Sequence, residues 1–521
     1  MSERLRIRGG RVYDPKHAVD GEVRDVCIED GRVVATLPDD APRLDAGGLV
    51  VMPGAIDIHS HVAGPTVNLA RRLEPERATV PSTLDTGRLY SLLGYTTVFD
   101  AAVPLLGARQ AHLELHDTPI VDKGFYVLLG NDEFLLKSLA DGETERAREI
   151  VAWTVNAARA YGVKVVSPGA ASAWKSSRAP LGLEDPLPGR ALTPRRILAS
   201  IASAVDELGL PHPMHLHCNN LGLAGNATTT LDTMAALDGR RTHFAHLQFH
   251  CYGGQPGGRP TSRAREVIEA LGRHPKLSAD VGQVMFGAAT TMTADSRVGE
   301  LLHDLTGRKW VDTDLELEAG CGIVPYEYRE KNVVHAMQWA AGLELLLLSQ
   351  DPWRLVLSTD HPNGATFLAY PRLIRLLMDR SYRDEQLARV NPQGLEGTAL
   401  RDGLAREYSL FEIAIVTRAG PARLLGLENK GHLGPGADAD VAIYAPEADV
   451  EKMFTTPRHV LKAGVPVAED GRITRESRGR TLTSAPHYDS AVERWLRDVL
   501  KCHGSLELDD YVIAEGELQE A

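Results

Sequence analysis

The pair His59-Ser60-His61 closes the apolar run GAIDIHSH. Residues i and i+2 of a strand point to the same side, so both imidazoles should share one face, with Asp57 one step deeper on it. Paired imidazoles of this kind are typical ligands of a transition metal. A histidine in a protein core is the alternative, but the position at the end of an apolar strand favours metal ligands.

Lys164 lies inside another apolar run, YGVKVVSPG. A buried ammonium group is unfavourable unless it is paired or loses its charge. Reaction with CO₂ would convert the amine into a carboxylate that can bridge two cations, whereas an ammonium cannot bind a metal. A lysine that extends along the strand to reach solvent is the alternative, and this residue alone does not decide between the two.

Further donors follow at the ends of later apolar runs. They are His215 and His217 in HPMHLHCNN, His243, His246 and His250 in THFAHLQFH, and Asp360 and His361 in VLSTDHPNG. Imidazoles and carboxylates without thiolates suit Zn²⁺ better than Mn²⁺, Fe²⁺ or Co²⁺. Donors at the ends of five such runs are poorly explained by core packing, so the sequence predicts a metal centre.

Eight apolar runs separated by helical segments must position these donors. They are GAIDIHSH, TTVFDAA, GFYVLLG, GVKVVSPG, HPMHLHCNN, RTHFAHLQF, LSADVGQV and RLVLSTDHP. Strands rich in valine, isoleucine and leucine that alternate with helices are typical of a parallel sheet covered on both faces. Eight units predict an α/β fold with a closed (β/α)₈ barrel, in which the active site lies at the carboxyl ends of the strands.

Both ends of the chain have a different pattern, with short strands separated by tight glycine turns. We expect residues 1–52 and 428–485 to form the two parts of one small β-sandwich. The barrel, residues 53–427, would be inserted between them. Residues 486–521 should form a C-terminal helix followed by a peripheral acidic tail.

Composition excludes several classes of protein. A chain of 521 residues is too long for one ordinary core, and its net charge of −13 disfavours nucleic acid as a partner. Five scattered cysteines without a C-x-x-C pair argue against a disulfide framework and an iron–sulfur site. No apolar run has the length of a signal peptide or a membrane span, so a cytoplasmic location is expected.

The set of donors, with His-x-His on strand one, Lys on four, His on five and six and Asp on eight, resembles the binuclear amidohydrolase superfamily. Within it, the chain resembles the A-subunit family of formylmethanofuran dehydrogenases and bacterial formyltransferase/hydrolase complexes. Stretches that carry this resemblance include DIHSHVAGPTVNLARRLEPE, MHLHCNNLGLAGNATTTLDTM, HLQFHCYGG, SADVGQVMFGAATTMT and STDHPNGATFLAYPRLIRLLMDR. They cover most of residues 50–385.

The resemblance implies a site with two zinc ions. By matching position, the metal ligands would be His59, His61, N6-carboxylated Lys164 as the bridge, His217, His246 and Asp360. Residues that could support these ligands are His215, Asn219, Asn220, His250 and His361.

The resemblance also implies the reaction, which is hydrolysis of N-formylmethanofuran to formate and methanofuran in bacterial one-carbon metabolism. The two metals would ionise a water, and Asp360 would take its proton and pass it to the departing amine. The alternative setting is a CO₂-reducing formylmethanofuran dehydrogenase, in which the same chain condenses formate onto methanofuran. A composition rich in arginine and alanine, without the lysine and glutamate enrichment of hyperthermophiles, favours a bacterial setting.

The sequence also bears on two other classes of protein. The long matching stretches count against a hydantoinase- or dihydroorotase-like enzyme that acts on a free cyclic amide. The presence of all six donor positions counts against a catalytically silent scaffold subunit.

The resemblance further implies partner subunits, while the net charge and the lack of a long apolar run argue against nucleic acid and a membrane as partners. The tail from about Ser505 and the segment from about Met285 to Trp353 are the expected docking surfaces, because a bare barrel needs neither. Arginines that could receive a polar, glutamate-rich substrate tail, or else lie solvated at the surface, are Arg71, Arg72, Arg178, Arg195 and Arg196.

Overall fold

Eight parallel strands form the central sheet of the computed structural model. The structure describes residues 3–73, 79–176, 180–308, 311–312, 322–503 and 506–518. In chain order the eight strands are β6 (Ala55–Ser60), β7 (Tyr95–Val103), β8 (Asp122–Leu129), β9 (Gly162–Val166), β10 (Met214–His217), β11 (Thr242–Phe244), β14 (Leu277–Asp280) and β18 (Leu355–Val356). Each pairs with its neighbours in sequence order. Ser60 bridges His361, which follows β18, and the His61 N–H donates to the His361 carbonyl at 2.7 Å. The sheet therefore curls back on itself as the predicted (β/α)₈ barrel.

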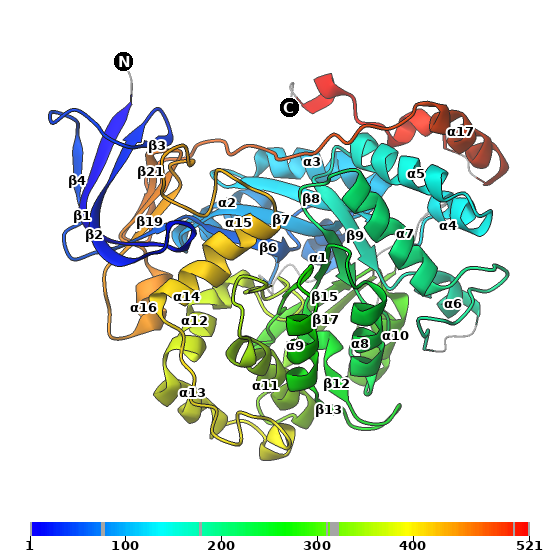
Figure 1. The fold of residues 1–521 in the computed structure, drawn as a ribbon. Coiled ribbons are helices and arrows are strands. Elements are labelled where there is room, and N and C mark those ends of the chain that lie inside the picture. The colour runs from blue at the N-terminus through cyan, green and yellow to red at the C-terminus, as the bar shows by residue number, and fades with distance from the viewer. Residues whose placement is uncertain are drawn as a thin grey trace.

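Helices cover the outside of this barrel (Figure 1). One follows each strand, namely α2 (Thr83–Leu92), α3 (Ala108–Asp117), α5 (Thr144–Ala157), α7 (Pro194–Glu207), α8 (Asn226–Ala236), α9 (Ala264–Arg273), α11 (Val333–Leu348) and α12 (Tyr370–Met378). Helix α7 begins where the Thr193 hydroxyl accepts from the Arg196 N–H, with Pro194 at its first position, and it buries Ile197 and Ile201. The remaining connections contain α4 (Glu133–Ala140), α6 (Ala170–Ser176), α13 (Arg380–Leu387), α14 (Leu410–Ala414) and α15 (Gly420–Leu424).

A second sheet joins the two ends of the chain. Its strands are β1 (Arg4–Asp14), β2 (Val19–Glu29), β3 (Arg32–Val34), β4 (Arg43–Asp45), β5 (Val50–Pro53), β19 (Val441–Tyr444), β20 (His459–Lys462), β21 (Val465–Glu469) and β22 (Arg472–Ile473), with α16 (Val450–Thr455) after β19. The two halves meet where β5 pairs antiparallel with β19, so that Pro53 faces Val441. The barrel segment is thus inserted between strands of one sheet, which lies beside the barrel in Figure 1.

A buried ion cluster links this sheet to the amino-terminal end of the barrel. Asp122, at the start of β8, contacts the ammonium groups of Lys430 at 2.7 Å and Lys462 at 2.9 Å. The same two ammonium groups contact Asp440 at 2.6 and 2.8 Å. Burial alone would raise the pKa of Asp440, but the two lysines lower it to about 2. The junction therefore depends on mutually compensating buried charges.

An insertion between β14 and β18 lies over the barrel mouth. Its described part contains β15 (Gly287–Thr293), α10 (Ser296–Thr306), β16 (Val311–Asp312) and β17 (Gly322–Tyr328), and β17 pairs with both other strands. Helix α1 (Pro65–Leu73) packs against it, because Val67 and Ala70 share an apolar cluster with Met292 and Ile323. Residues 309–310 and 313–321 of the expected docking segment lie outside the described residues.

The C-terminal segment packs on the barrel. Helix α17 (Ala491–His503) lies against α5, with the Arg146 guanidinium 4.8 Å from the centre of the Trp495 ring. Leu508, Tyr511 and Ile513 are buried in the main apolar core, so the expectation of a peripheral tail is wrong for these residues. Ser505 and residues 519–521 of that predicted tail lie outside the described part. Among the described helices, none is long and apolar enough to cross a membrane.

Candidate metal centre

His59 and His61 lie at the barrel mouth, at the end of β6, and both are buried. The pairing of β6 with β7 shifts register between Asp57 and Ser60. Asp57 accepts hydrogen bonds at 2.7 Å from the hydroxyls of Tyr90 on α2 and Tyr370 on α12, in the layer between barrel and helices. The prediction that Asp57 shares the face of His59 is therefore wrong, because the register shift interrupts the alternation of side chains.

Lys164 is 2% exposed, and its side chain enters the same cavity as His59 and His61. Within the described part of the chain, its Nζ has no hydrogen-bond partner. Burial lowers the pKa of the amine to about 8. A lysine that reaches solvent along the strand is excluded, and a buried amine without a partner is compatible with carboxylation.

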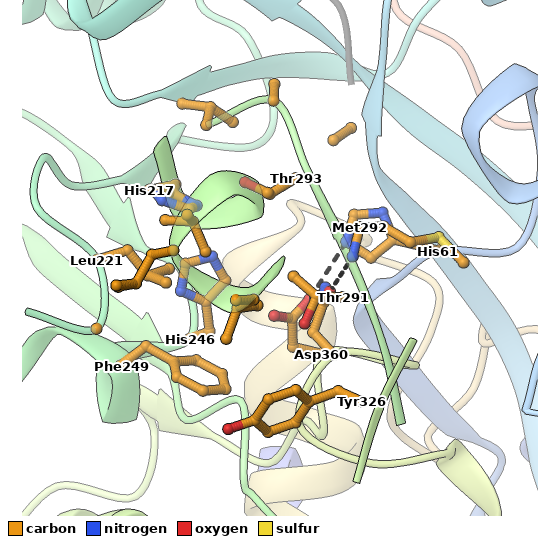
Figure 2. Close-up of a pocket in the computed structure, with 18 of the residues that line it drawn as sticks. His61, His217, Leu221, His246, Phe249, Thr291, Met292, Thr293, Tyr326 and Asp360 are labelled. Carbon is orange, nitrogen blue, oxygen red and sulfur yellow. Dashed lines mark hydrogen bonds and ion pairs between the residues drawn. The ribbon is translucent and has the colours of Figure 1, made fainter. Parts of the chain in front are cut away.

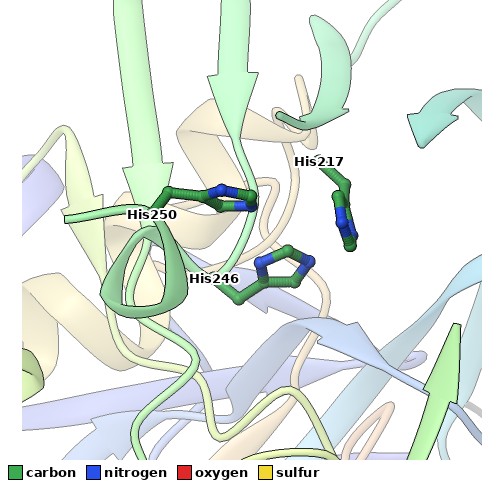
Figure 3. A group of neighbouring side chains, drawn as sticks. All are labelled: His217, His246 and His250. Atoms are coloured by element: carbon green, nitrogen blue, oxygen red, sulfur yellow. The ribbon is translucent and has the colours of Figure 1, made fainter. Parts of the chain in front are cut away.

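Three imidazoles from β10 and the loop after β11 converge on the other side of the cavity (Figure 3). His217, His246 and His250 each offer a ring nitrogen, and these atoms lie within 4.8 Å of one another. Nε2 of His217, Nδ1 of His246 and both ring nitrogens of His250 are buried without a hydrogen-bond partner among the described residues. His250 was expected only to support the ligands, but one of its ring nitrogens lies within 4.8 Å of a ring nitrogen of each predicted ligand, His217 and His246.

Asp360 follows β18 and faces the histidines of β6. Its Oδ1 lies 3.0 Å from Nε2 of His59 and 3.2 Å from Nε2 of His61, the latter contact being drawn in Figure 2. Asn363 donates to the same oxygen at 2.8 Å. Burial alone would raise the pKa of Asp360, but the imidazoles of His59 and His246 hold it well below its usual range.

Apart from His250, these side chains line one cavity of about 130 Å³. Figure 2 shows His61, His217, His246 and Asp360 around it, with Tyr326 and Phe249 at one side. The six predicted ligand positions, on five different strands or the loops that follow them, all contribute to its lining. The outer wall is largely apolar and consists of Leu221, Phe249, Met292, Val298, Leu301, Leu302 and Leu305.

The donor set fits a pair of transition-metal ions. His246 belongs to two candidate groups, one with His217 and His250 and one with His59 and Asp360. Two adjacent sites that share one region of the cavity are therefore compatible with the side chains present. Buried nitrogens without partners are costly unless something absent from the chain satisfies them, and a metal ion would do so.

The other predicted supporting residues have different positions. His215 lies beneath the cavity, with its Nε2 3.0 Å from Nδ1 of His59. Asn219 donates to the Pro168 carbonyl at 3.4 Å, and Asn220 donates to the Leu181 carbonyl at 3.0 Å. His361 accepts from the Phe367 N–H at 3.3 Å. Asn219, Asn220 and His361 thus hold loops around the mouth and are not part of the cavity lining.

Two of the arginines suggested for a substrate pocket make contacts of their own, Arg71 with Glu114 at 3.3 Å and Arg195 with Glu184. The Arg71 guanidinium also donates hydrogen bonds to the carbonyls of Pro81 and Val62. Arg178 lies outside the described residues.

Sequence reasoning missed Asp280, the last residue of β14. Its Oδ2 lies 2.9 Å from Nδ1 of His59 and 3.2 Å from Nε2 of His243, and its Oδ1 accepts from the His246 N–H at 2.9 Å. A carboxylate at the end of an apolar strand was the available signal, as it was for Asp360. Strand β14 therefore contributes to the centre by holding two predicted ligands.

Comparison with known proteins gives near-complete matches. The amidohydrolase family profile matches residues 44–468. The protein FwdA of Methanocaldococcus jannaschii is 41% identical over 98% of this chain and 96% of its own length. The A-subunit of the formyltransferase/hydrolase complex Fhc of Methylorubrum extorquens is 41% identical over 99% of this chain and 97% of its own.

A crystal structure of the formyltransferase/hydrolase complex FhcABCD from Methylorubrum extorquens, in complex with methylofuran, contains a chain with the same fold. The two chains superpose with a TM-score of 0.94 at 40% identity. The match covers 99% of this chain and 97% of the other. The similarity therefore includes the barrel, the second sheet and the insertion over the mouth.

Proposed function

The chain belongs to the amidohydrolase family, and from that premise we propose that it hydrolyses the formamide bond of an N-formylated carrier of the methanofuran type. Formate and the free carrier amine would be the products. The observation that carries the proposal is that all six predicted metal ligands line one buried cavity, in a chain with near-complete similarity to the A-subunit of Fhc.

The proposed cofactor is a pair of zinc ions, held by His59, His61, His217, His246 and Asp360 and bridged by carboxylated Lys164. Imidazoles and carboxylates in a site lined by no cysteine, among the described residues, support zinc over softer metals. Two bound ions would supply a water that ionises near neutral pH and would polarise the formyl oxygen.

Asp360 is the proposed general base and acid. Among the described residues of the cavity lining, it is the one aspartate or glutamate. Asn363 donates to its carboxylate at 2.8 Å, and the Ser358 hydroxyl accepts from its backbone N–H at 2.8 Å, so both the side chain and the backbone of Asp360 are held. Asp360 would accept the proton of the attacking water and return it to the nitrogen that leaves.

The apolar outer wall supports a substrate with a small reacting group on a larger, partly apolar body. The formyl group would lie at the predicted metal ligands, while Phe249 and Leu302 would contact the body of the carrier and exclude bulk water. The related complex FhcABCD binds methylofuran in its crystal structure, which supports a substrate of the methanofuran type.

The same site could serve the reverse reaction in a second setting. FwdA is as similar to this chain as the A-subunit of Fhc is. The residues that assist hydrolysis would also assist condensation of formate with the amine, because both directions pass through the same transition state. In either setting we propose that the chain works as one subunit of a hetero-oligomer, as its relative does in FhcABCD.

The test is purification from the native host without a tag, followed by native mass measurement, metal analysis and a formate-release assay with N-formylmethanofuran. We expect a hetero-oligomer with two zinc ions per copy of this chain and one formate released per carrier amine. Dihydroorotate and hydantoin are the control substrates and should not be turned over.

Two results would contradict parts of the proposal. A fully metallated assembly that releases no formate would rule out the hydrolase activity. A homo-oligomer of this chain that matches the turnover of the host extract would rule out the hetero-oligomer.

A further inference from the structure

A line of buried hydrogen bonds connects the floor of the barrel to a proposed metal ligand. Nδ1 of His212 lies 2.9 Å from the Leu424 carbonyl oxygen, and Nε2 of His212 lies 3.0 Å from Nδ1 of His215. Nε2 of His215 lies 3.0 Å from Nδ1 of His59. All three rings are completely buried, so no water competes for these contacts.

The carbonyl at the far end sets the direction of every bond in this line. A carbonyl oxygen only accepts, so His212 must carry its proton on Nδ1. A neutral ring has a single N–H, which leaves Nε2 of His212 to accept from Nδ1–H of His215. By the same step, Nε2 of His215 accepts from Nδ1–H of His59. The lone pair of His59 is then on Nε2, the atom that lies 3.0 Å from Asp360 in the cavity.

Asp280 also favours a proton on Nδ1 of His59. Its Oδ2 lies 2.9 Å from Nδ1 of His59, and a carboxylate also accepts. The proton on Nδ1 of His59 therefore has two acceptors, Asp280 and His215. If His59 carried its proton on Nε2 instead, Nε2 of His215 would lose its donor, and the lone pair on Nδ1 of His59 would face the carboxylate of Asp280.

The ring planes of His212 and His215 are also held in place. Tyr126 stacks on His212 and on His215, with ring centres 4.8 Å apart in each case. Its hydroxyl donates to the Ile58 carbonyl at 2.9 Å, which fixes the tyrosine to β6, the strand that carries His59. The two histidines are thus part of the packed interior of the barrel, and their rings are preorganised without a ligand.

We propose that His212 and His215 form a tautomer relay, anchored on the Leu424 carbonyl and completed by Asp280, that keeps Nε2 of His59 unprotonated and directed at the metal. This inference rests on the metal centre of the proposed function. His212, His215 and Asp280 are positioning residues, since they act on the metal through His59. Partners of this kind change metal affinity by roughly 10–100-fold in other metal sites.

The first experiment replaces His212 with phenylalanine, which retains a ring for stacking on Tyr126 but removes the acceptor for His215. The matched control is Tyr161→Phe, which loses a 2.6 Å hydrogen bond to the adjacent Leu425 carbonyl in the same layer but leaves the relay intact. Zinc affinity is measured by chelator competition on the full chain in its native assembly, and thermal melting monitors the fold.

The relay predicts an affinity about tenfold weaker for His212→Phe and unchanged for Tyr161→Phe, at comparable melting temperatures. Equal zinc affinity in the wild type and both variants would overturn the relay. Absence of zinc binding in the wild type would instead count against the proposed function, so the two failures are distinguishable.

A second measurement does not depend on the folding of any variant. In protein labelled with nitrogen-15 in histidine, chemical shifts distinguish a ring protonated on Nδ1 from one protonated on Nε2. We expect His212 and His215 to be neutral Nδ1–H rings, with and without zinc. An Nε2–H ring at His212 would overturn the relay.

Discussion

Gly282 and His246 lie in direct contact across the barrel mouth. A Cβ atom built on Gly282 would lie 2.3 Å from the Cβ atom and 2.7 Å from the Cα atom of His246. Gly282 also has a φ of 63°, a conformation that favours glycine. His246 can therefore occupy its position only because residue 282, in the loop after β14, has no side chain.

The first prediction follows from this contact. Gly282→Ala should displace His246 and lower the zinc content per chain, in addition to a destabilisation of about 1 kcal/mol from the strained backbone. Gly239→Ala is the matched control, since Gly239 has a φ of 79° with nothing within 4 Å of an added Cβ. Full zinc content in Gly282→Ala, measured by metal analysis, would show that the contact does not position the ligand.

The second prediction concerns the proposed bridge. Lys164→Ala should lose both metals and activity, with partial recovery of each when a small carboxylate such as acetate is added. Lys123→Met is the control, because Lys123 is equally buried on the neighbouring strand but donates to the Thr118 carbonyl at 2.9 Å, away from the cavity. Lys164→Ala protein that keeps its zinc would contradict the carboxylated bridge.

The third prediction isolates proton transfer. Asp360→Asn should keep the fold and part of the metal while the rate of formate release falls by about 10²–10⁴, the usual loss when a general base is removed. The control is Asp132→Asn, a buried carboxylate that caps α4 and that asparagine replaces well. Near-normal turnover of Asp360→Asn would show that Asp360 is not the general base.

The fourth prediction concerns stability at the junction of the barrel and the second sheet. Lys430→Met should destabilise the protein by about 3–5 kcal/mol at pH 7, because buried carboxylates lose a partner. Lys137→Met, which removes an exposed ion pair to Asp141, should cost less than about 1 kcal/mol. Thermal or denaturant unfolding of both variants measures the difference.

The pH dependence of that destabilisation has a definite sign. In the wild type, the depressed pKa of Asp440 means that its contribution to stability is present above about pH 4 and is lost as the pH falls toward about 2. Without Lys430, burial would shift the pKa of Asp440 upward. The deficit of Lys430→Met should therefore shrink between pH 7 and about pH 4, and a deficit that grows on acidification would contradict the role of Lys430.

Much of the barrel could be predicted because its strands are continuous apolar runs. Lys164 and Asp360 could be singled out from the same pattern, since a charged residue inside or at the end of such a run needs a partner or a role. The structure brings all six predicted ligands to one cavity, and their binding of metal stays a prediction.

Other features depend on geometry that a linear pattern does not contain. Alternation placed Asp57 beside His59, but a register shift turns it toward Tyr90. Asp280 lies at a strand end like Asp360, yet its role requires knowledge of which histidines it faces. The segment over the mouth was interpreted only as a docking surface, because its short antiparallel strands carry no repeated pattern, whereas Met292 and Leu302 line the cavity.

The pairing of β5 with β19 has a consequence for synthesis on the ribosome. At roughly 5–20 residues per second, the chain between Pro53 and Val441 takes about 20–80 seconds to emerge. Throughout that interval the edge of β5 that β19 will cover is exposed, and such edges recruit strands of other chains. The N-terminal strands therefore expose the nascent protein to aggregation until β19 has been synthesised and can pair with β5.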